Sequence, residues 1–222
     1  MTIVDFDELN KLGLKVEVSE NVNMSIPYHT YFGKMYITPE QLKNRVKLAE
    51  QIEDVMLYVF AYWVIAANAE MPIEEVKADA KSKLTRVLSK HTKIDEYLEK
   101  HIDKVIDEVV DTTVRQTSDD KEGGSEYWLS RDRAKTIAEN EANAFENYVE
   151  YRNAVISGKT KKRWVTENDD KVRMTHALAE GQTVDIDGLF LVGESMMRFP
   201  MDTLYDPDPA ETINCRCACR YE

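Results

Sequence analysis

Hydrophobic residues recur every three or four positions through the first half of the chain, the spacing of one face of an α-helix. The first stripe follows "TPEQ", where Thr38 as N-cap, Pro39 at the first helical position and Gln41 completing a capping box predict a helix start. Further stripes begin near "MPIEE" and near Ile94. Their members are Leu42, Val46, Ala49, Ile52, Val55, Val59 and Trp63; Ile73, Val76, Ala80, Leu84 and Val87; and Ile94, Leu98, Ile102, Val105 and Val109. Because each stripe needs an apolar partner, the pattern predicts a helical bundle.

A polar interruption separates these helices from a fourth. The stretch "RQTSDDKEGGSE", about 115–126, has no apolar residue to bury and predicts a linker or an exposed loop. The fourth helix is expected from Ser130, as N-cap, to Gly158, a residue typical of helix C-termini.

After Gly158 the spacing shortens to that of strands and small helices. "KKRWVT" predicts a strand, and "NDDKVRMTHALAEG" a short helix capped by Asn168 or Asp169 and ended by Gly181. "TVDIDGLFLVG" alternates around Asp187–Gly188, a dipeptide favoured in tight turns, and predicts a β-hairpin. "PMDTLYDPDPAE" is expected to be a loop, "INCRCACRY" a final strand, and the bulky core residues are Trp164, Phe190 and Phe199.

Together these patterns predict an α+β protein, with an N-terminal helical bundle followed by a small C-terminal α+β unit that carries a short antiparallel sheet. We expect an extended arm over 1–37, a helical domain over 38–158 and the α+β unit over 159–222. The arm contains the aromatic-rich "SIPYHTYFGKMYI", which either docks on another protein or lies over the chain's own core.

Charge and hydropathy narrow the classes of partner. The 222 residues carry a formal net charge of −12, which argues against general binding of nucleic acid through its phosphates. "GKTKKRW", Gly158 to Trp164, is the local exception, either a basic patch that contacts DNA or a solvated loop. The longest apolar run, Val55 to Ala67, is shorter than the ~20 residues of a membrane span, so no membrane partner is expected. The first residues lack a secretory pattern, which predicts synthesis in the cytoplasm.

Arg173 and His176 stand three residues apart on the predicted short helix and would share a face. An arginine beside a histidine could bind and protonate a phosphate, as a ribonuclease requires, with Glu141, Asp202 or Asp206 as the additional carboxylate. In the other interpretation Arg173 pairs with a carboxylate and His176 bonds to backbone, both for structural reasons.

All three cysteines lie in "CRCAC" near the end of the chain, which argues against a disulfide framework. On a flat strand the outer thiols would be ~13 Å apart, so at most two could share an ion with zinc–sulfur bonds of ~2.3 Å. The simplest zinc site is Cys215 and Cys217 with His176 and a fourth ligand such as Asp202 or water. The alternative is that the thiols pack inward while Arg216 and Arg220 face outward.

Read in order, the second half contains "AKTIAENEANAFENYVEYRNAVISGKTKKRWVTENDDKVRMTHALAEGQTV", then "LF", "FPMD" and "ETINCRC". Over about 130–219 this order resembles the minor head protein family of tailed phages, the Mu F-like head morphogenesis domain. The matching positions are Glu141, Trp164, Asp169, Arg173, His176, Gly181, Phe190, Pro200, Asp202, Asn214, Cys215, Arg216 and Cys217. Asn140, in place of a hydroxyl residue, and the additional Cys219 depart from the pattern.

The resemblance implies a structural protein of the phage head, present in few copies and associated with the portal. Its implied partners are the portal protein and the major capsid protein, and its role lies in procapsid assembly and in DNA packaging or ejection. It would reside in the cytoplasm of the infected host and then in the virion. The alternative function is a nuclease that uses Arg173 and His176.

Overall fold

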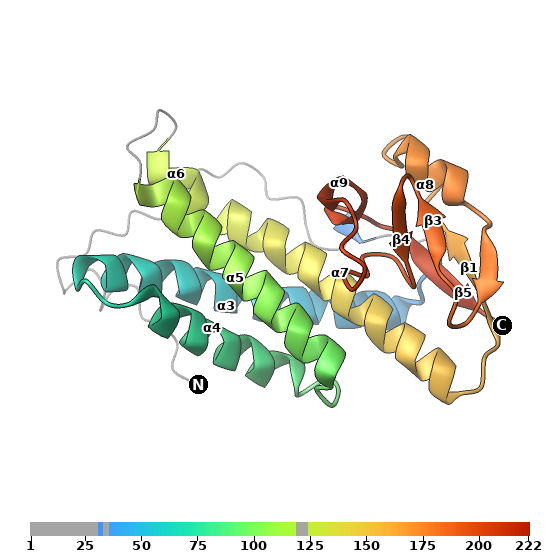
Figure 1. Ribbon diagram of the computed structural model, residues 1–222, viewed down its shortest axis with the longest axis horizontal. Helices are drawn as coiled ribbons and strands as arrows, with labels where there is room; N and C mark the ends of the chain where they lie inside the picture. The colour runs from blue at the N-terminus through green and yellow to red at the C-terminus, as the bar shows by residue number, and fades with distance from the viewer. Residues whose placement is uncertain (1–30, 33–35, 119–123) are drawn as a thin grey trace. The chain divides into compact units, whose positions relative to one another are not determined.

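The structure is a computed structural model that describes residues 31–32, 36–118 and 124–222 (Figure 1). Two compact units divide the chain. Among the described residues, unit 1 comprises 50–118 and 124–138, and unit 2 comprises 31–32, 36–49 and 139–222. Both boundaries between the units in the described part fall inside long helices, α3 and α7. The predicted α+β fold class is confirmed.

Helix α3, Pro39–Asn68, begins where the capping box predicts. The Thr38 backbone N–H donates to Gln41 Oε1 at 2.7 Å, and the Gln41 N–H donates to Thr38 Oγ1 at 3.2 Å. These two bonds satisfy donors that have no partner within the helix.

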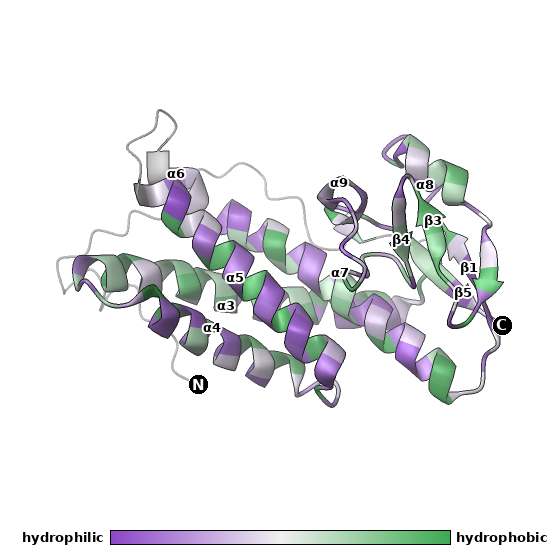
Figure 2. Ribbon diagram, in the orientation of Figure 1, coloured by the Kyte–Doolittle hydropathy of each residue, from purple (hydrophilic) through white to green (hydrophobic). Residues whose placement is uncertain are grey.

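Unit 1 buries the predicted stripes of α4, Ile73–Leu88, and α5, Glu96–Ser118. Figure 2 shows hydrophobic and hydrophilic residues alternating along both helices. The fully or nearly buried side chains include Val76, Ala80, Leu84 and Leu88 of α4 and Leu98, Ile102, Ile106 and Val110 of α5. The amphipathic pattern therefore identifies the apolar faces of these helices correctly.

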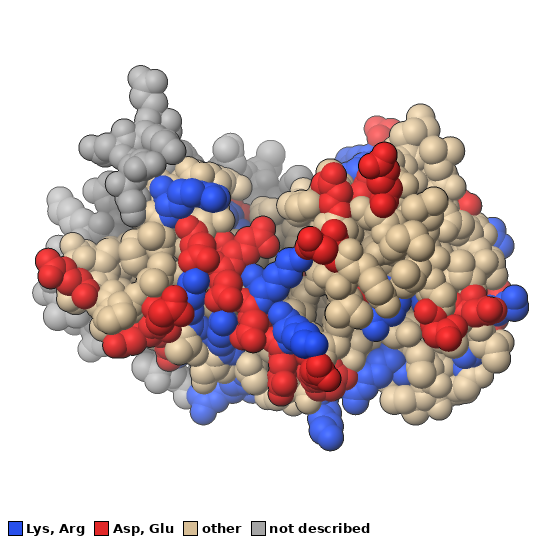
Figure 3. Space-filling model, viewed as in Figure 1, with Lys and Arg blue, Asp and Glu red and all other residues tan. Residues whose placement is uncertain are grey.

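Acidic and basic side chains interleave over α5 in the view of Figure 3. Lys77 Nζ lies 2.7 Å from Asp111 Oδ1, and Lys81 Nζ lies 3.1 Å from both Asp103 and Asp107. Since these carboxylates are exposed to solvent, such pairs add little stability individually.

The predicted loop over about 115–126 is too long. Helix α5 continues to Ser118, and a short helix, α6, occupies Gly124–Trp128; 119–123 lie outside the described residues. The polar face of an amphipathic helix carries no apolar signal, so its last turn looks like a loop in the sequence.

Helix α7, Arg131–Ile156, has the predicted ends. Ser130 Oγ accepts a hydrogen bond from the Arg133 N–H at 3.2 Å, and Gly158 has the left-handed φ of 72° that ends many helices.

Unit 2 contains two small sheets. The first has the order β2-β1-β5, with β1 at Lys161–Val165, β2 at Thr183–Asp185 and β5 at Ala218–Tyr221, all antiparallel. Trp164 of β1 is in register with Cys219 of β5. The second sheet pairs β3, Phe190–Val192, with β4, Ser195–Met197. Two short helices, α8 at Met174–Ala179 and α9 at Pro209–Thr212, also lie in this unit.

The predicted hairpin around Asp187–Gly188 is wrong. The turn forms, since the Gly188 N–H donates to the Asp185 carbonyl, but β2 pairs with β1 and β3 pairs with β4. Alternation specifies which faces are buried, and it does not specify which strand is the neighbour. The β3–β4 turn contains Gly193, whose φ of 61° favours glycine.

Two further element boundaries differ from the prediction. Helix α8 starts at Met174 with Arg173 as its N-cap, because Asn168, with φ 53°, and Asp169 belong to a preceding turn. "INCRCACRY" is a strand only from Ala218. Asn214 has a φ of 57° and bends the chain, so Cys215 and Cys217 precede β5 on irregular backbone.

The core of unit 2 forms around Trp164 and Phe190, which are fully buried and meet edge to face at 5.3 Å between ring centroids. Phe199 is also fully buried, as predicted. Lys162, which was expected to be exposed either in a basic patch or in a solvated loop, is buried instead: its Nζ donates to the Ile186 carbonyl at 2.7 Å and lies over the Tyr151 ring.

Of the predicted arm, only 31–32 and 36–37 are described, and the rest lies outside the described residues. Phe32 is buried, the Tyr31 hydroxyl donates to Asn140 Oδ1 at 3.2 Å, and the Arg220 guanidinium lies over the Tyr36 ring. These residues of the arm pack within unit 2. Among the described helices, none combines the length and apolar character needed to cross a membrane.

Candidate functional site

Helix α8 presents His176 to the interior of unit 2. Met174 and Leu178 on the same helix are exposed, whereas His176 is 2% exposed. Its ring meets Trp164 edge to face, with 5.9 Å between ring centroids. The β1 tryptophan thereby helps to fix the position of the imidazole.

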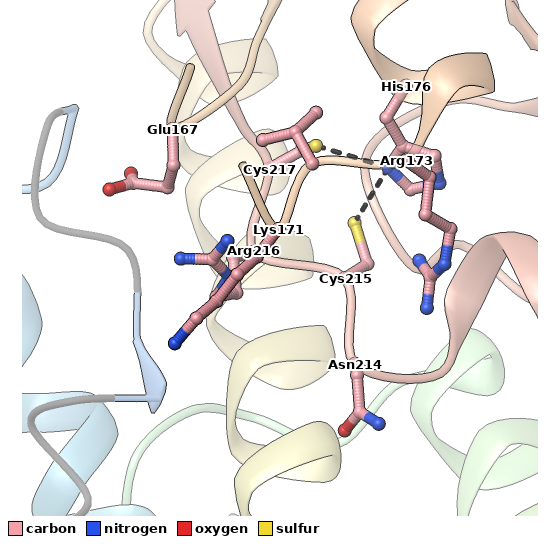
Figure 4. A pocket seen from close by; sticks show the side chains of 9 residues that line it. Glu167, Lys171, Arg173, His176, Asn214, Cys215, Arg216 and Cys217 are labelled. Carbon is pink, nitrogen blue, oxygen red and sulfur yellow. Dashed lines mark hydrogen bonds between the residues drawn. The ribbon is translucent and has the colours of Figure 1, made fainter. Parts of the chain in front are cut away.

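Two thiols face one nitrogen of this ring (Figure 4). His176 Nδ1 lies 3.3 Å from Cys217 Sγ and 3.7 Å from Cys215 Sγ. The three atoms all lie within 4.8 Å of one another, and both cysteines are buried. The structure thus brings together the three residues that the sequence nominated as metal ligands.

The other ring nitrogen faces a carboxylate that the sequence analysis missed. Glu211 of α9 places Oε2 2.9 Å from His176 Nε2, but the buried Nε2 makes no hydrogen bond in the described structure. Thr175 Oγ1 donates to the same oxygen at 2.7 Å. The only signal in the sequence was an acid in "PAET", a stretch that was predicted to be a loop.

The segment that carries the cysteines is held by side chains of α7. Asn143 Nδ2 donates to the Cys215 carbonyl at 2.9 Å, and Asn140 Oδ1 accepts from the Asn214 N–H at 2.5 Å. Asn140, noted as a departure from the family pattern, therefore has a structural role. These bonds fix the backbone on both sides of the bend at Asn214.

A buried arginine supports this arrangement from behind. Arg45 is 1% exposed; its Nε donates to Asn143 Oδ1 at 3.0 Å and its Nη2 to Asn147 Oδ1 at 3.2 Å. Its Nη1 lies 2.8 Å from Glu150 Oε1, an ion pair that balances the buried charge. Asn147 in turn donates to the Pro200 carbonyl at 3.1 Å.

Two arginines stabilise the outer side of the segment. Arg216 makes a bidentate contact with the Asp169 carboxylate, at 2.8 and 2.6 Å, and Arg173 Nη2 donates to the Ile213 carbonyl. The bidentate geometry is the strong form of this pair. The contact of Arg173 with a carbonyl differs from both sequence-based interpretations of this residue.

The three cysteines have different pKa values because their surroundings differ. The hydrogen bond from Cys217 lowers the pKa of Cys215 to about 5 against the opposing effect of burial, with a further contribution from His176. The pKa of Cys217 is raised, because it donates to Cys215 and is buried. Burial raises the pKa of Cys219 to about 12. Cys215 is thus the thiol most readily ionised in this site.

A small pocket gives access to the cluster. Its lining residues are Glu167, Lys171, Val172, Arg173, His176, Asn214, Cys215, Arg216 and Cys217. Figure 4 shows the charged ends of Glu167, Lys171 and Arg216 pointing away from the sulfur atoms. The pocket wall next to the thiols is therefore formed by the candidate metal ligands, His176, Cys215 and Cys217, together with Arg173.

The carboxylates proposed for nuclease chemistry lie elsewhere. Asp202 accepts from Arg198 Nε at 2.8 Å and from the Arg198 and Leu204 backbone N–H groups. Neither Asp202 nor Glu141 nor Asp206 lines the pocket. None of the three carboxylates considered for nuclease chemistry therefore stands with His176 at the pocket.

The remaining family positions support the fold around the cluster. Gly181, with φ 80°, ends α8, and its N–H donates to the Trp164 carbonyl at 2.9 Å. Phe190 packs on Trp164, and the Pro200 carbonyl binds Asn147. Cys219, the cysteine beyond the family pattern, lies on β5 in register with Trp164 of β1. It is not part of the His176 cluster.

The family model of the Phage Mu protein F like proteins matches residues 79–220, well over half of the chain. No curated protein and no solved structure shows significant similarity to this chain. The matched range includes the stretch from Glu141 to Cys217, in which the predicted motif lies. With this match, the chain belongs to the Phage Mu protein F like family.

Proposed function

We propose that the protein is a minor component of the phage head that binds the portal protein and acts in procapsid assembly and in DNA packaging or ejection. Family membership carries the proposal, because it indicates a phage head morphogenesis protein. The family also indicates a structural protein of the virion that interacts with other phage structural proteins. The portal, as the specific partner, is the further step of this proposal.

The charge of the protein supports protein partners over DNA. The net charge of −12 repels phosphate, and of the basic stretch after α7 only Lys159, Lys161 and Arg163 are exposed. Since each phosphate contact contributes modestly and depends on salt, three cations support at most a weak local contact with DNA.

Co-expression with the phage portal protein, followed by affinity purification of the portal, tests the proposal. We expect the full chain to co-purify with assembled portal rings and to remain bound at moderate ionic strength. The matched bait is the major capsid protein. Retention by the capsid protein with none by the portal would replace the proposed partner, and retention by neither would contradict the proposed role.

The nuclease alternative has a separate test. Labelled RNA and DNA are incubated with the purified chain and with His176→Ala. We expect no cleavage above background in either sample, because the carboxylates nominated for this chemistry, Glu141, Asp202 and Asp206, do not line the pocket. Cleavage that disappears in the variant would establish the enzyme instead.

A further inference from the structure

We propose that His176, Cys215 and Cys217 bind one zinc ion, with Nδ1 and the two Sγ atoms as ligands and a fourth position that faces the pocket. This inference rests on the geometry of unit 2 and does not depend on the role of the protein in the phage head.

The distances between the three atoms fit a tetrahedral ion. Zinc–nitrogen bonds of ~2.0 Å and zinc–sulfur bonds of ~2.3 Å put tetrahedral ligand atoms roughly 3.6 to 3.8 Å apart. His176 Nδ1 lies 3.3 and 3.7 Å from the two sulfurs, and all three atoms lie within 4.8 Å of one another. Small side-chain rotations would therefore complete the site.

The irregular backbone after the bend at Asn214 brings the two thiols closer together than a flat strand would. Alternate residues of a strand lie ~6.8 Å apart, which separates their side chains. Because Cys215 and Cys217 precede β5 on irregular backbone, their sulfur atoms converge on His176. The Asn143 and Asn140 bonds hold this backbone with or without an ion.

The surroundings of His176 provide independent support. A histidine that binds a metal through one nitrogen usually directs its other nitrogen to a carboxylate, which fixes the tautomer and the ring orientation. Glu211 Oε2 lies at this position, 2.9 Å from Nε2, and Thr175 holds the same oxygen. A hydrogen bond from Nε2–H to this oxygen would turn the Nδ1 lone pair towards the thiols.

Packing alone accounts for this arrangement less well. A buried imidazole nitrogen loses its hydrogen bonds to water and needs a strong partner. The contacts of Nδ1 in the described structure are two thiol sulfurs, which are weak hydrogen-bond partners. Two thiolates and one neutral imidazole satisfy zinc and balance its charge, and these soft ligands disfavour magnesium and calcium.

Water is the expected fourth ligand. Asp202, the candidate from the sequence, is fully buried against Arg198 and is engaged there. His176, Cys215 and Cys217 all line the small pocket, so a water in this pocket would be within reach of the fourth position. Zinc would then join α8 to the C-terminal segment, two parts of unit 2 about forty residues apart in sequence.

The test measures zinc in the full chain purified without chelator, and then titrates the metal-free protein with Co²⁺. We expect about one equivalent of zinc and an intense thiolate-to-cobalt absorption band in the near ultraviolet. His176→Ala, Cys215→Ser and Cys217→Ser should each lose the band. Cys219→Ser is the matched control and should keep both the zinc and the band.

Two measurements on folded protein keep the test independent of misfolding variants. Bound metal should protect two of the three thiols of the wild-type chain from alkylation. Glu211→Gln should weaken zinc affinity about 10- to 100-fold, whereas the exposed Glu194→Gln should not change it. Wild-type protein that binds neither zinc nor cobalt, or equal losses in Cys219→Ser and Cys215→Ser, would overturn the proposal.

Discussion

At the scale of single residues, the buried polar side chains of α7 position the cluster. Asn140, Asn143 and Asn147 each bind the C-terminal part of the chain, and Arg45 connects the last two. Buried polar groups must be satisfied, so these contacts specify one position of the cysteine segment.

Asn143→Ala should destabilise the protein by about 1–3 kcal/mol, because it leaves the Cys215 carbonyl and Arg45 Nε without their partner. Chemical denaturation followed by circular dichroism measures the change. Asn153→Ala, at an exposed position of the same helix, is the control and should stay within about 0.5 kcal/mol of wild type. Equal losses in both variants would show that the network is not needed.

The Asp169–Arg216 pair should make stability depend on pH. Hydrogen bonds from Arg216 lower the pKa of Asp169, so the pair stabilises the folded state above the ordinary aspartate pKa of about 4, and this contribution is lost as pH falls through the folded value. The carboxylate is 39% exposed, so the effect is a few tenths to about 1 kcal/mol.

In thermal melts, the Tm difference between wild type and Asp169→Asn should therefore shrink between pH 6 and pH 3. The neighbouring exposed Asp170→Asn should show no such trend. A constant difference for Asp169→Asn across this range would contradict the assignment.

The sequence predicted the three residues of the cluster, but it did not predict the side chains that hold them in place. His176, Cys215 and Cys217 belong to residue types with a known metal preference, so they could be nominated without a structure. Glu211 and the α7 asparagines could not, because an acid in a loop or an amide in a helix acquires a partner only through tertiary packing. The three- and four-residue spacing of the asparagines was the one available signal.

At the scale of elements, helix ends with a local capping signal were predictable and strand pairing was not. Thr38, Ser130 and Gly158 mark ends through local bonds that the sequence encodes directly. The partner of β2 depends on β1, some twenty residues earlier, and the Asp187–Gly188 turn is compatible with either pairing. The N-terminus of α8 was misplaced for a similar reason, since Asp169 caps a turn and binds the distant Arg216.

The β3–β4 turn offers a test of how an element supports the cluster. A Cβ on Gly193 would lie 2.6 Å from Glu211 Oε1, at a φ of 61°. Gly193→Ala should therefore cost the ~1–2 kcal/mol of a left-handed alanine and also displace the carboxylate from His176. Thermal denaturation and zinc affinity measure the two effects.

Gly158→Ala is the matched control, because its φ of 72° is similar and a Cβ there would meet nothing within 4 Å. It should lose stability by a similar conformational amount and leave zinc affinity unchanged. If Gly158→Ala also binds zinc more weakly, or if Gly193→Ala keeps the zinc affinity of the wild type, the β3–β4 turn does not support the site as proposed.

At the scale of the whole molecule, the chain combines two compact units, and different features of the sequence specify the fold of each. Unit 1 buries the apolar stripes of its helices, which many sequences could supply. Unit 2 holds the ordered set of Trp, Arg, His and Cys positions on which the family resemblance rested, and the family match over residues 79–220 covers the C-terminal segment of this unit and part of unit 1. The boundaries 1–37, 38–158 and 159–222 stay a prediction.

The most direct test of the central claim, that this is a component of the phage head, is quantitative mass spectrometry of procapsids and virions purified from infected host cells. We predict the protein in both particles at a few copies, and its loss from particles assembled without the portal protein. Particles that contain portal and major capsid proteins but none of this chain would contradict the account.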